Sequence, residues 1–538
     1  MENDSLHPHS IWSATAEMPV YPPLSANVTA EVCVIGAGLA GLTTAYLLGK
    51  QGVRVAVLEA LDVGAGETGR TTAHIAVPDE GFFHIESSYG REVAQYGREV
   101  AQLVAESFAA AADFIEATSR AEDIDCAFER LDGYLFSCAS DARAALQREL
   151  AAASRAGVRV QMQEELPVAT LGSGPCLRFA DQAQFHPMRY LAGLARAVER
   201  QRGAIYCGTR ASDVEERNGV VIVTTPMGKI RADAAVVATN TPFNDRVSIH
   251  LKQSAYHTYV VGALVKQGAV PRALIWDDGD PYHYVRLARE LDDEHDLLIV
   301  GGADHKVGQE QHPARHYGEL ETWLREHFPE AGRIVYRWSG EVMEPLDGLA
   351  YIGRNPGSRN VYVITGDSGN GMTHTTLGGM LVSDLILGRR NRWSSVYDPQ
   401  RKPYKETSEF LREQSNIAAQ YTDWLTASEE IDVAALAPGE GAVIRAGLRR
   451  YAVYRDELGA LHGRSAACTH LGCLVQWNDV ERTWDCPCHG SRYSAYGSVL
   501  HGPAVSALAP IPDEEWEELL EPHPPGERRA REERPGRE

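Results

Sequence analysis

Ala467-Cys-Thr-His-Leu-Gly-Cys473 is followed, after twelve further residues, by Cys486-Pro-Cys-His-Gly-Ser-Arg-Tyr493. The two stretches supply two thiolates and two imidazoles, from Cys468, His470, Cys486 and His489. That set suits one metal centre, either a tetrahedral zinc or a [2Fe-2S] cluster with cysteines on one iron and histidines on the other. Cys473 and Cys488 lie beside these residues, where a disulfide could tie the two loops together. A zinc finger has no use for this second cysteine pair, so the pattern favours the iron–sulfur cluster.

Both stretches resemble the cluster loops of the Rieske domain, in the high-potential form found in cytochrome bc complexes, because CTHLGC and CPCHGS are both intact. The resemblance implies one iron bound by Cys468 and Cys486, the other bound by His470 and His489, and a disulfide between Cys473 and Cys488. It also implies that the hydroxyls of Ser491 and Tyr493 donate hydrogen bonds to cluster and ligand sulfur. Such donors stabilise the reduced cluster, so both raise its potential within the range of roughly −150 to +300 mV. We therefore expect a cluster that accepts electrons readily.

Composition limits the remaining possibilities. The chain has 538 residues, a formal net charge of −22, 44% hydrophobic residues and 23% charged residues. Its length predicts about three domains, and its charge argues against a nucleic-acid partner. We expect no transmembrane segment, because no run of about 18 apolar residues occurs. The first thirty residues show no export signal, and the five cysteines outside the cluster loops show no pairing pattern, so we expect a cytoplasmic protein.

A glycine fingerprint near the N-terminus predicts a dinucleotide-binding fold. An apolar strand, Glu31–Ile35, leads into Gly36-Ala-Gly38-Leu-Ala-Gly41, and a helix is expected over Leu42–Lys50. A second strand, Val53–Leu58, ends in Glu59, where a carboxylate would accept hydrogen bonds from a ribose. Because strand, glycine turn, helix, second strand and acid occur in this order, a bland glycine-rich turn is a poor alternative. Proteins that bind NAD and proteins that bind FAD both use this arrangement of strand, glycine turn, helix and acid.

The loop Gly64–His74 (GAGETGRTTAH) favours FAD. With it the chain resembles the D-amino acid oxidase and glycine oxidase type of FAD-dependent amine oxidoreductases, as far as about Gly388. A second strand, glycine loop and helix, at Val361–Thr365 and onward, fits the same family. The resemblance implies FAD contacts from Gly36, Gly38, Leu39, Ala40, Gly41, Glu59, Ala60, Thr68, Gly69, Arg70, Thr71, Thr72, Ala73, His74, Val214, Thr239, Gly366, Asp367, Gly371, Met372 and Thr373. A covalent bond from His74 to the flavin stays open.

The segment Pro281–Arg286 reads as a strand in the substrate-covering sheet of that family. Alternation places Tyr282, Tyr284 and Arg286 on one face and His283 on the other. Tyr284 and Arg286 are the candidate catalytic residues, because an arginine beside aromatic rings can orient a substrate carboxylate. A half-exposed sheet face with Arg286 stacked on tyrosine is an equally good interpretation. The sequence names no acid or base.

We expect an α/β FAD-binding Rossmann-like domain with an inserted α+β substrate domain, followed by a C-terminal all-β Rieske domain. The predicted segments are a lead (1–27), the FAD-binding domain (28–80, 180–245 and 330–390), the substrate domain (81–179 and 246–329), a connector (391–429), the Rieske domain (430–522) and a disordered tail (523–538). The tail consists mostly of Pro, Arg, Glu and Gly, which leaves little to bury.

The predicted function is oxidation of a small amine or amino acid by hydride transfer to FAD. Electrons then pass singly to the Rieske cluster and on to an external acceptor, which is a small redox protein, a quinone or oxygen. One alternative is the reverse flow, from cluster to flavin, for a reduction or oxygen activation. Another is a redox sensor without turnover. A Rieske oxygenase is least favoured, because no domain remains for a mononuclear iron.

Overall fold

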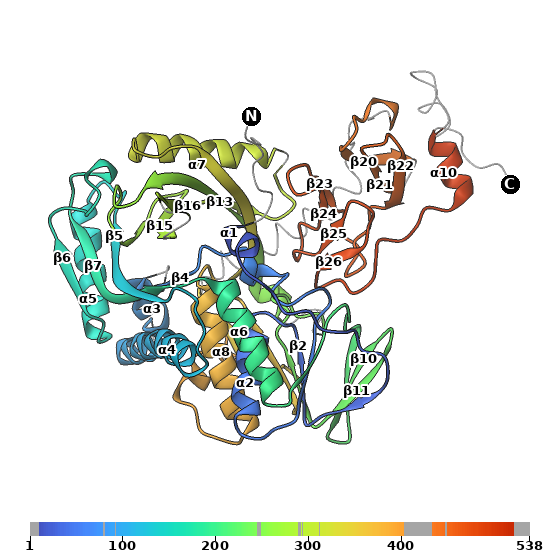
Figure 1. Ribbon diagram of the computed structural model, residues 1–538, viewed down its shortest axis with the longest axis horizontal. Helices are drawn as coiled ribbons and strands as arrows, with labels where there is room; N and C mark the ends of the chain where they lie inside the picture. The colour runs from blue at the N-terminus through green and yellow to red at the C-terminus, as the bar shows by residue number, and fades with distance from the viewer. Residues whose placement is uncertain are drawn as a thin grey trace. The chain divides into compact units, whose positions relative to one another are not determined.

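The computed structural model describes residues 10–78, 81–91, 93–244, 249–288, 292, 294–310, 312–402, 433–446 and 449–520. The chain forms two compact units (Figure 1). The larger unit comprises Met1–His305 and Arg315–Phe410, and the smaller one comprises Lys306–Ala314 and Leu411–Glu538. The predicted connector is described only to residue 402, and the predicted tail lies outside the described residues. None of the described helices is both long enough and apolar enough to cross a bilayer.

A six-stranded sheet in the larger unit has the order β18-β19-β12-β2-β3-β8. Its strands are β2 (Val32–Ile35), β3 (Val55–Leu58), β8 (Ala204–Tyr206), β12 (Ala234–Val237), β18 (Tyr351–Arg354) and β19 (Val361–Thr365). Neighbouring strands run parallel, except that β18 runs antiparallel to β19. Every residue of β2 and β3 is buried, as expected of strands covered on both faces. This sheet confirms the predicted Rossmann-like fold.

Three helices pack together beside this sheet, α2 (Leu39–Gly49), α6 (Pro187–Arg200) and α8 (Gly371–Ile386) (Figure 1). Helix α2 begins before the predicted start at Leu42, because Gly38 is its N-cap. The last glycine of the fingerprint therefore lies in the first helical turn. A Cβ on Gly379 of α8 would lie 2.6 Å from Cγ2 of Thr43, so this glycine allows α8 to approach α2 closely.

A four-stranded sheet packs against the six-stranded sheet. It has the order β1-β11-β10-β9, with β1 (Val28–Thr29), β9 (Asp213–Arg217), β10 (Val220–Thr225) and β11 (Gly228–Ala232). Alternate residues of β10, among them Val221 and Val223, are buried. These side chains share a core cluster with Cys33 and Ile35 of β2, so the small sheet closes one side of the nucleotide fold.

The substrate domain is built on a nine-stranded sheet with the order β17-β13-β16-β15-β14-β5-β7-β4, in which β6 also pairs with β7. Its strands are β4 (His74–Ile75), β5 (Glu129–Phe136), β6 (Val160–Gln163), β7 (Cys176–Gln184), β13 (Gln253–Lys266), β14 (Leu274–Asp277), β15 (His283–Ala288), β16 (His295–Lys306) and β17 (Ile334–Pro345). Helix α7 (Ala314–His327) lies along this sheet (Figure 1). The ring of Tyr317 from α7 packs edge-on against Tyr259 of β13, with centroids 5.0 Å apart.

The predicted segmentation needs correction at the end of the first FAD-binding segment (28–80) and, more extensively, at the start of the third (330–390). Strand β17 lies inside that segment, yet it pairs along its whole length with β13 in the nine-stranded sheet. Strand β4, at the end of the first segment, also joins this sheet through β7. Apolar patterning identifies a strand but not the sheet that it joins. The other predicted boundaries stay predictions.

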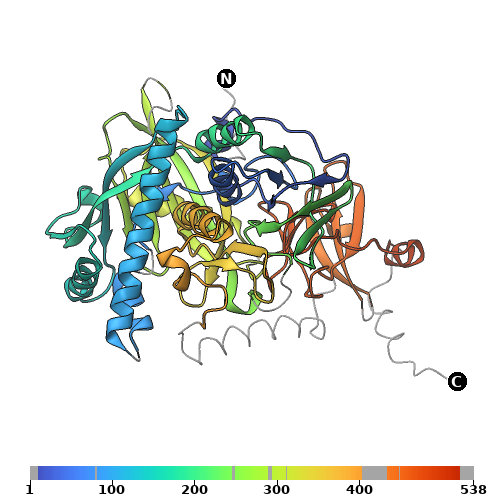
Figure 2. The same ribbon diagram turned by 90° about the horizontal axis from the view of Figure 1, so that it is seen from below.

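The remaining α-helices that the structure describes in the larger unit are α1 (Ile11–Ala14), α3 (Phe82–Tyr89), α4 (Ala94–Ala121) and α5 (Ala142–Arg155). Figure 2 shows α4, in light blue, as a long rod, and it packs on α3, α5 and α8. Its buried residues include Val100, Val104, Ala111 and Ile115, which recur at helical spacing on one face.

The smaller unit carries two small antiparallel sheets, as predicted for an all-β domain. The first has the order β20-β21-β22, with β20 (Gly441–Ala446), β21 (Arg449–Arg455) and β22 (Leu461–Ser465). The second has the order β23-β24-β25-β26, with β23 (Gln476–Asn478), β24 (Thr483–Asp485), β25 (Arg492–Ser494) and β26 (Val499–His501). A helix follows, α10 (Asp513–Leu520). Because β24 and β25 flank the second cluster loop, their pairing fixes both of its ends.

Candidate functional site

The glycine turn after β2 has no room for side chains. Gly36 has a φ of +108°, and a Cβ on it would lie 2.3 Å from the carbonyl oxygen of Ala238. A Cβ on Gly41 would lie 1.9 Å from the carbonyl oxygen of Gly36. The N-cap of α2, Gly38, offers no side-chain hydrogen bond, so backbone N–H groups occupy this helix end. Such an end is suited to bind a phosphate.

Glu59 lies at the end of β3, next to this turn. Its carboxylate accepts hydrogen bonds from the N–H groups of Ala37 at 2.8 Å and of Leu61 at 2.9 Å. Burial raises the pKa of Glu59, and these backbone donors oppose the rise. The structure therefore puts a carboxylate beside the glycine turn, where the sequence predicted the ribose acid.

A segment that precedes Val214 also contacts Glu59. The N–H of Thr209 donates to the carbonyl oxygen of Glu59 at 2.7 Å. The positive charge of the Arg210 guanidinium opposes the rise in the pKa of the Glu59 carboxyl. Val214 itself lies in β9, opposite Val223. Sequence reasoning missed Thr209 and Arg210, although their position directly after the parallel strand β8 is a usable signal.

The loop Gly64–His74 contains a short 3-10 helix, η1 (Glu67–Gly69), and it contacts helix α2 and strand β17. The hydroxyl of Thr68 accepts from the N–H of Leu39 at 3.1 Å, at the start of α2. The carboxylate of Glu67 accepts from the N–H of Glu341 at 2.7 Å, in β17. These bonds hold the loop between the nucleotide fold and the substrate sheet.

The second glycine loop lies at the other end of the domain. The carboxylate of Asp367 accepts from the N–H of Met343 at 3.0 Å, and burial raises the pKa of Asp367 to about 7. The hydroxyl of Thr239, after β12, donates to the carbonyl oxygen of Thr241 at 3.0 Å. Helix α8 begins at Gly371 without a side-chain cap, and the buried residues Met372 and Thr373 lie in its first turn, where the backbone N–H groups have no partner within the helix. Two uncapped helix ends and a carboxylate at the end of β3 together fit a dinucleotide cofactor.

Strand β15 alternates as predicted. The ring of Tyr284 packs edge-on against His74 at 5.7 Å, and its hydroxyl shares a hydrogen bond of 2.7 Å with Thr258. His283 instead stacks on Trp323 of α7, with centroids 4.3 Å apart. Tyr284 is thereby placed next to the predicted flavin loop.

Arg286 is turned toward that loop rather than toward an open cavity. Its Nη1 donates to the carbonyl oxygens of Thr72 at 2.9 Å and of Ala73 at 2.7 Å. The residue is only 3% exposed, and burial lowers its pKa to about 9, so the guanidinium stays charged at neutral pH. These bonds involve only Nη1, and the role of Arg286 in orienting a substrate carboxylate stays a prediction.

Both ring nitrogens of His74 have partners. Nδ1 lies 3.0 Å from the hydroxyl of Thr72, and Nε2 lies 3.4 Å from the carbonyl oxygen of Val285. Burial lowers the pKa of His74 to about 3, so the ring is neutral. These contacts argue against a covalent bond to flavin.

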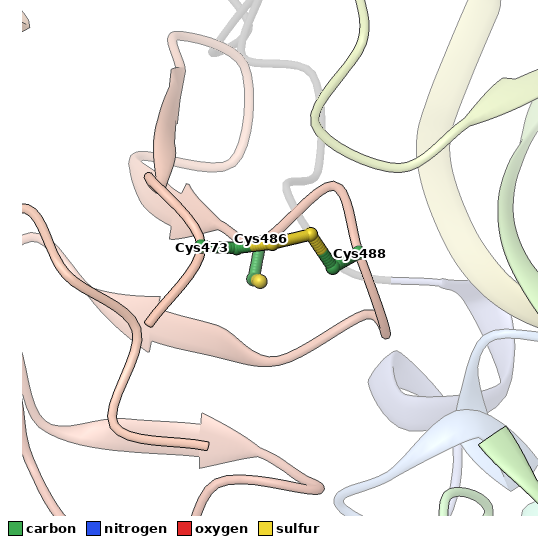
Figure 3. Close-up of side chains that lie close together, drawn as sticks. All are labelled: Cys473, Cys486 and Cys488. Atoms are coloured by element: carbon green, nitrogen blue, oxygen red, sulfur yellow. A yellow bond between two sulfur atoms is a disulfide. The ribbon is translucent and has the colours of Figure 1, made fainter. Parts of the chain in front are cut away.

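The cluster loops meet as the sequence predicts. Cys473 and Cys488 form a disulfide with a Cα–Cα distance of 6.5 Å, and Cys486 lies beside it (Figure 3). The thiols of Cys468 and Cys486 share a hydrogen bond, which lowers the pKa of Cys468 and favours its thiolate. The rings of the two predicted histidine ligands, His470 and His489, lie with centroids 4.9 Å apart. Two adjacent thiols and two adjacent imidazoles fit a cluster with a cysteine iron and a histidine iron.

Tyr493 and Ser491 lie against the cysteine sulfur. The phenol oxygen of Tyr493 is 3.2 Å from Sγ of Cys468, and Ser491 is fully buried within hydrogen-bonding range of the same sulfur. The N–H of Thr469 donates to the phenol oxygen at 3.1 Å, and the Thr469 hydroxyl donates to the carbonyl oxygen of Ser506 at 2.6 Å. The phenol proton is therefore directed toward acceptors, of which the sulfur is one. Sequence reasoning missed Thr469.

Comparisons with known proteins agree with these two sites. Residues 31–385 match the family described as FAD dependent oxidoreductase, and residues 424–512 match the Rieske [2Fe-2S] domain. The chain is 30% identical over 511 residues to the "Putative Rieske 2Fe-2S iron-sulfur protein YhfW" of Bacillus subtilis, which covers 94% of this chain and 97% of that protein. It is 26% identical to gamma-glutamylputrescine oxidoreductase of Escherichia coli, over 74% of this chain and 93% of the relative.

A structure of glycine oxidase from Geobacillus kaustophilus has the same fold, with a TM-score of 0.58 at 19% identity, over 70% of this chain and 99% of that one. The iron–sulfur subunit of the cytochrome b6-f complex of Arabidopsis thaliana is 53% identical over 57 residues, which are 11% of this chain and 25% of that subunit. Both resemblances made from the sequence are confirmed.

Proposed function

Because the chain belongs to the family of FAD dependent oxidoreductases and carries a Rieske [2Fe-2S] domain, we propose that it oxidises a small amine or amino acid and passes the electrons singly through its cluster to an external acceptor. FAD supplies a hydride acceptor and the cluster a one-electron acceptor. The observation that carries this proposal is that one chain holds both sets of cofactor-binding residues in intact form.

The residues around the glycine turns have distinct roles in holding FAD. The N-terminal amides of α2, with Gly36, Gly38 and Gly41 leaving the space, bind the pyrophosphate. Glu59 accepts hydrogen bonds from a ribose, and Arg210 lies beside it. Asp367 has a pKa of about 7, so near neutral pH its carboxyl both accepts and donates hydrogen bonds.

The substrate-facing group is Tyr284 rather than Arg286. Support comes from the bonds of Arg286 to the carbonyls of Thr72 and Ala73, because a donor that already binds two carbonyls is a poor site for a carboxylate. On the same face, the hydroxyl of Tyr282 donates to the carboxylate of Asp304 at 2.8 Å, and the rings of Tyr282 and Tyr284 lie 5.7 Å apart. Aromatic faces beside a carboxylate attract an ammonium group. Among the two substrate classes, this favours an amine over an amino acid. The name of the E. coli relative also describes an amine, gamma-glutamylputrescine, for that protein.

Electrons flow from flavin to cluster. The hydroxyl of Tyr493 at 3.2 Å from Sγ of Cys468 supports this direction, because a donor to the ligand sulfur stabilises the reduced cluster. A high-potential cluster is a poor reductant, so the reverse flow into the flavin is disfavoured. The acceptor is a small redox protein, a quinone or oxygen, and the compartment predicted from the sequence is the cytoplasm.

The experiment is anaerobic mixing of the oxidised protein with a panel of amines and amino acids. Bleaching of the flavin is followed optically and the reduced cluster by EPR. We expect at least one amine to bleach the flavin first and to produce the cluster signal afterwards. Reduction of the cluster without flavin bleaching would contradict the order. The absence of both signals with every compound would contradict the proposal and favour the two alternatives, reverse electron flow or a redox sensor.

A further inference from the structure

Consecutive backbone carbonyls in the flavin loop are each held by a side chain from elsewhere in the fold. Between Gly69 and Ala73 no carbonyl oxygen lacks such a donor. The bonds run from Ser10 Oγ to Gly69 O (2.5 Å), from Trp338 Nε1 to Arg70 O (3.0 Å), from Trp12 Nε1 to Thr71 O (2.6 Å), and from Arg286 Nη1 to Thr72 O (2.9 Å) and Ala73 O (2.7 Å).

The donors come from three segments that are far apart in the sequence. Ser10 and Trp12 belong to the N-cap and first turn of α1, which precedes the nucleotide fold. Arg286 lies on β15 and Trp338 on β17, both in the nine-stranded sheet. The Arg286 guanidinium also lies over the ring of Trp12, 5.1 Å from its centroid. Trp12 and Arg286 are 2% and 3% exposed, so water does not replace either donor.

This arrangement fixes the direction of each peptide in the loop. In a trans peptide the C=O and the following N–H point in opposite directions. The carbonyls of Arg70 and Thr71 point at Trp338 and Trp12, so the N–H groups of Thr71 and Thr72 point away from those rings. Ala73 adopts a φ of +61°, which is uncommon for a residue with a side chain. Its carbonyl is held by Arg286 and its N–H by the hydroxyl of Thr71 at 2.9 Å, so the fold holds this conformation from both sides.

We propose that Ser10, Trp12, Arg286 and Trp338 form a carbonyl clamp that presets residues 69–73 for binding FAD, with helix α1 as an integral part of the cofactor site. The proposal rests on the loop's contact with FAD, which belongs to the proposed function. The clamp residues do not touch the reacting atoms, so they are positioning residues. A preset loop loses less conformational freedom when the cofactor binds, and this increases the affinity.

The test is the dissociation constant for FAD of Trp12→Phe in the full chain, after removal and re-addition of the cofactor. Phenylalanine keeps an aromatic ring but removes the N–H donor, so the carbonyl of Thr71 stays buried without a partner. We expect the dissociation constant to rise about tenfold, together with a shift of the visible flavin spectrum.

Trp484→Phe is the matched control, because Trp484 is also fully buried and its Nε1 donates to a backbone carbonyl, that of Ala495 at 3.1 Å, in the smaller unit. Its FAD affinity should equal that of the wild type. A Trp12→Phe protein that binds FAD as tightly as this control, with an unchanged flavin spectrum, would overturn the clamp.

Arg286→Lys separates the clamp from a role in substrate binding. The clamp predicts weaker FAD binding with an unchanged KM for the amine when FAD is saturating, because lysine reaches the carbonyls with a single donor centre. A substrate-orienting arginine predicts the reverse, a raised KM with unchanged FAD affinity, and that result would also overturn the clamp. FAD affinity is measured without substrate, so the clamp fails or holds independently of whether any amine is oxidised.

Discussion

The two cofactor sites of this chain differ in how they are assembled. The cluster site lies within Cys468–Tyr493, on two loops that a disulfide and the short ladder between β23 and β24 bring together. The flavin site draws on residues from α1 to the start of α8, which span most of the larger unit. A site of the first kind can be read from local spacing, because each ligand is near the next along the chain. A site of the second kind depends on long-range packing, which no single motif records.

The first prediction removes a cluster ligand and tests whether the two cofactor sites assemble independently. Cys468→Ser should abolish the cluster completely, because one iron loses a thiolate that a serine hydroxyl does not replace. The flavin site should be unaffected, since no part of it lies in the cluster loops. Iron analysis, EPR and FAD content measure both outcomes. Cys138→Ser, at an exposed cysteine, is the control and should keep iron and FAD. Loss of FAD together with the cluster would mean that the two sites are not assembled independently.

The second prediction concerns the glycine turn, where the flavin site is most local. Gly41→Ala should weaken FAD binding by at least about 100-fold, because the new Cβ would lie 1.9 Å from the carbonyl oxygen of Gly36 and α2 must move. The cluster should remain. Gly318→Ala on the exposed face of α7 is the matched control, because nothing lies within 4 Å of its Cβ position. FAD titration of both apoproteins compares them. Equal affinities would show that α2 tolerates the displacement.

Both variants change residues that the sequence alone identifies as parts of a site. The glycine fingerprint with its ribose acid is a local pattern, and so is the set of cluster ligands. The structure brings together the members of each pattern, as expected. Alternation along β15 gave the correct face for Tyr284 and Arg286, but what faces an arginine depends on a loop more than 200 residues away. Ser10 and Trp12 carried no signal, because a short helix ahead of the fold has no characteristic spacing. Val214 was chosen by its position in a family pattern and stays a prediction. A backbone hydrogen bond brings Thr209, five residues earlier, to Glu59.

The third prediction uses the buried carboxyl of Asp367. Burial raises its pKa from 3.8 to about 7 in the folded protein. The folded state therefore binds this proton more tightly than the unfolded state does. The contribution of Asp367 to the free energy of unfolding is therefore most favourable below about pH 4, falls as the pH rises toward about 7, and is level above that.

Asp367→Asn should remove this pH dependence and leave the apoprotein more stable than the wild type above pH 7, by a few kcal/mol. Chemical denaturation of both apoproteins across the pH range gives the difference. Asp213→Asn, at an exposed carboxyl on β9, is the control, and its free energy of unfolding should change with pH as that of the wild type does. If Asp367→Asn also runs parallel to the wild type, the carboxyl is not desolvated, and the flavin site is more open than its packing indicates.

The fourth prediction has the smallest expected effect and concerns the reduction potential of the cluster. Tyr493→Phe removes one hydroxyl at 3.2 Å from Sγ of Cys468 and keeps the buried ring. A hydrogen bond to a charged sulfur contributes about 1.4 kcal/mol, which equals about 60 mV for a one-electron couple, so the cluster potential should fall by about that amount. The flavin potential should not change.

Tyr496→Phe is the matched control, because Tyr496 packs edge-on against Tyr454 and His462, and it is 49% exposed. Its cluster potential should equal that of the wild type in an EPR-monitored redox titration. A full shift in Tyr493→Phe would mean that one local hydroxyl sets how readily the cluster accepts electrons, as the short-range assembly of this site requires. Equal potentials for the two variants would instead assign the potential to the surrounding packing, and the cluster site would then depend on distant residues in the same way as the flavin site.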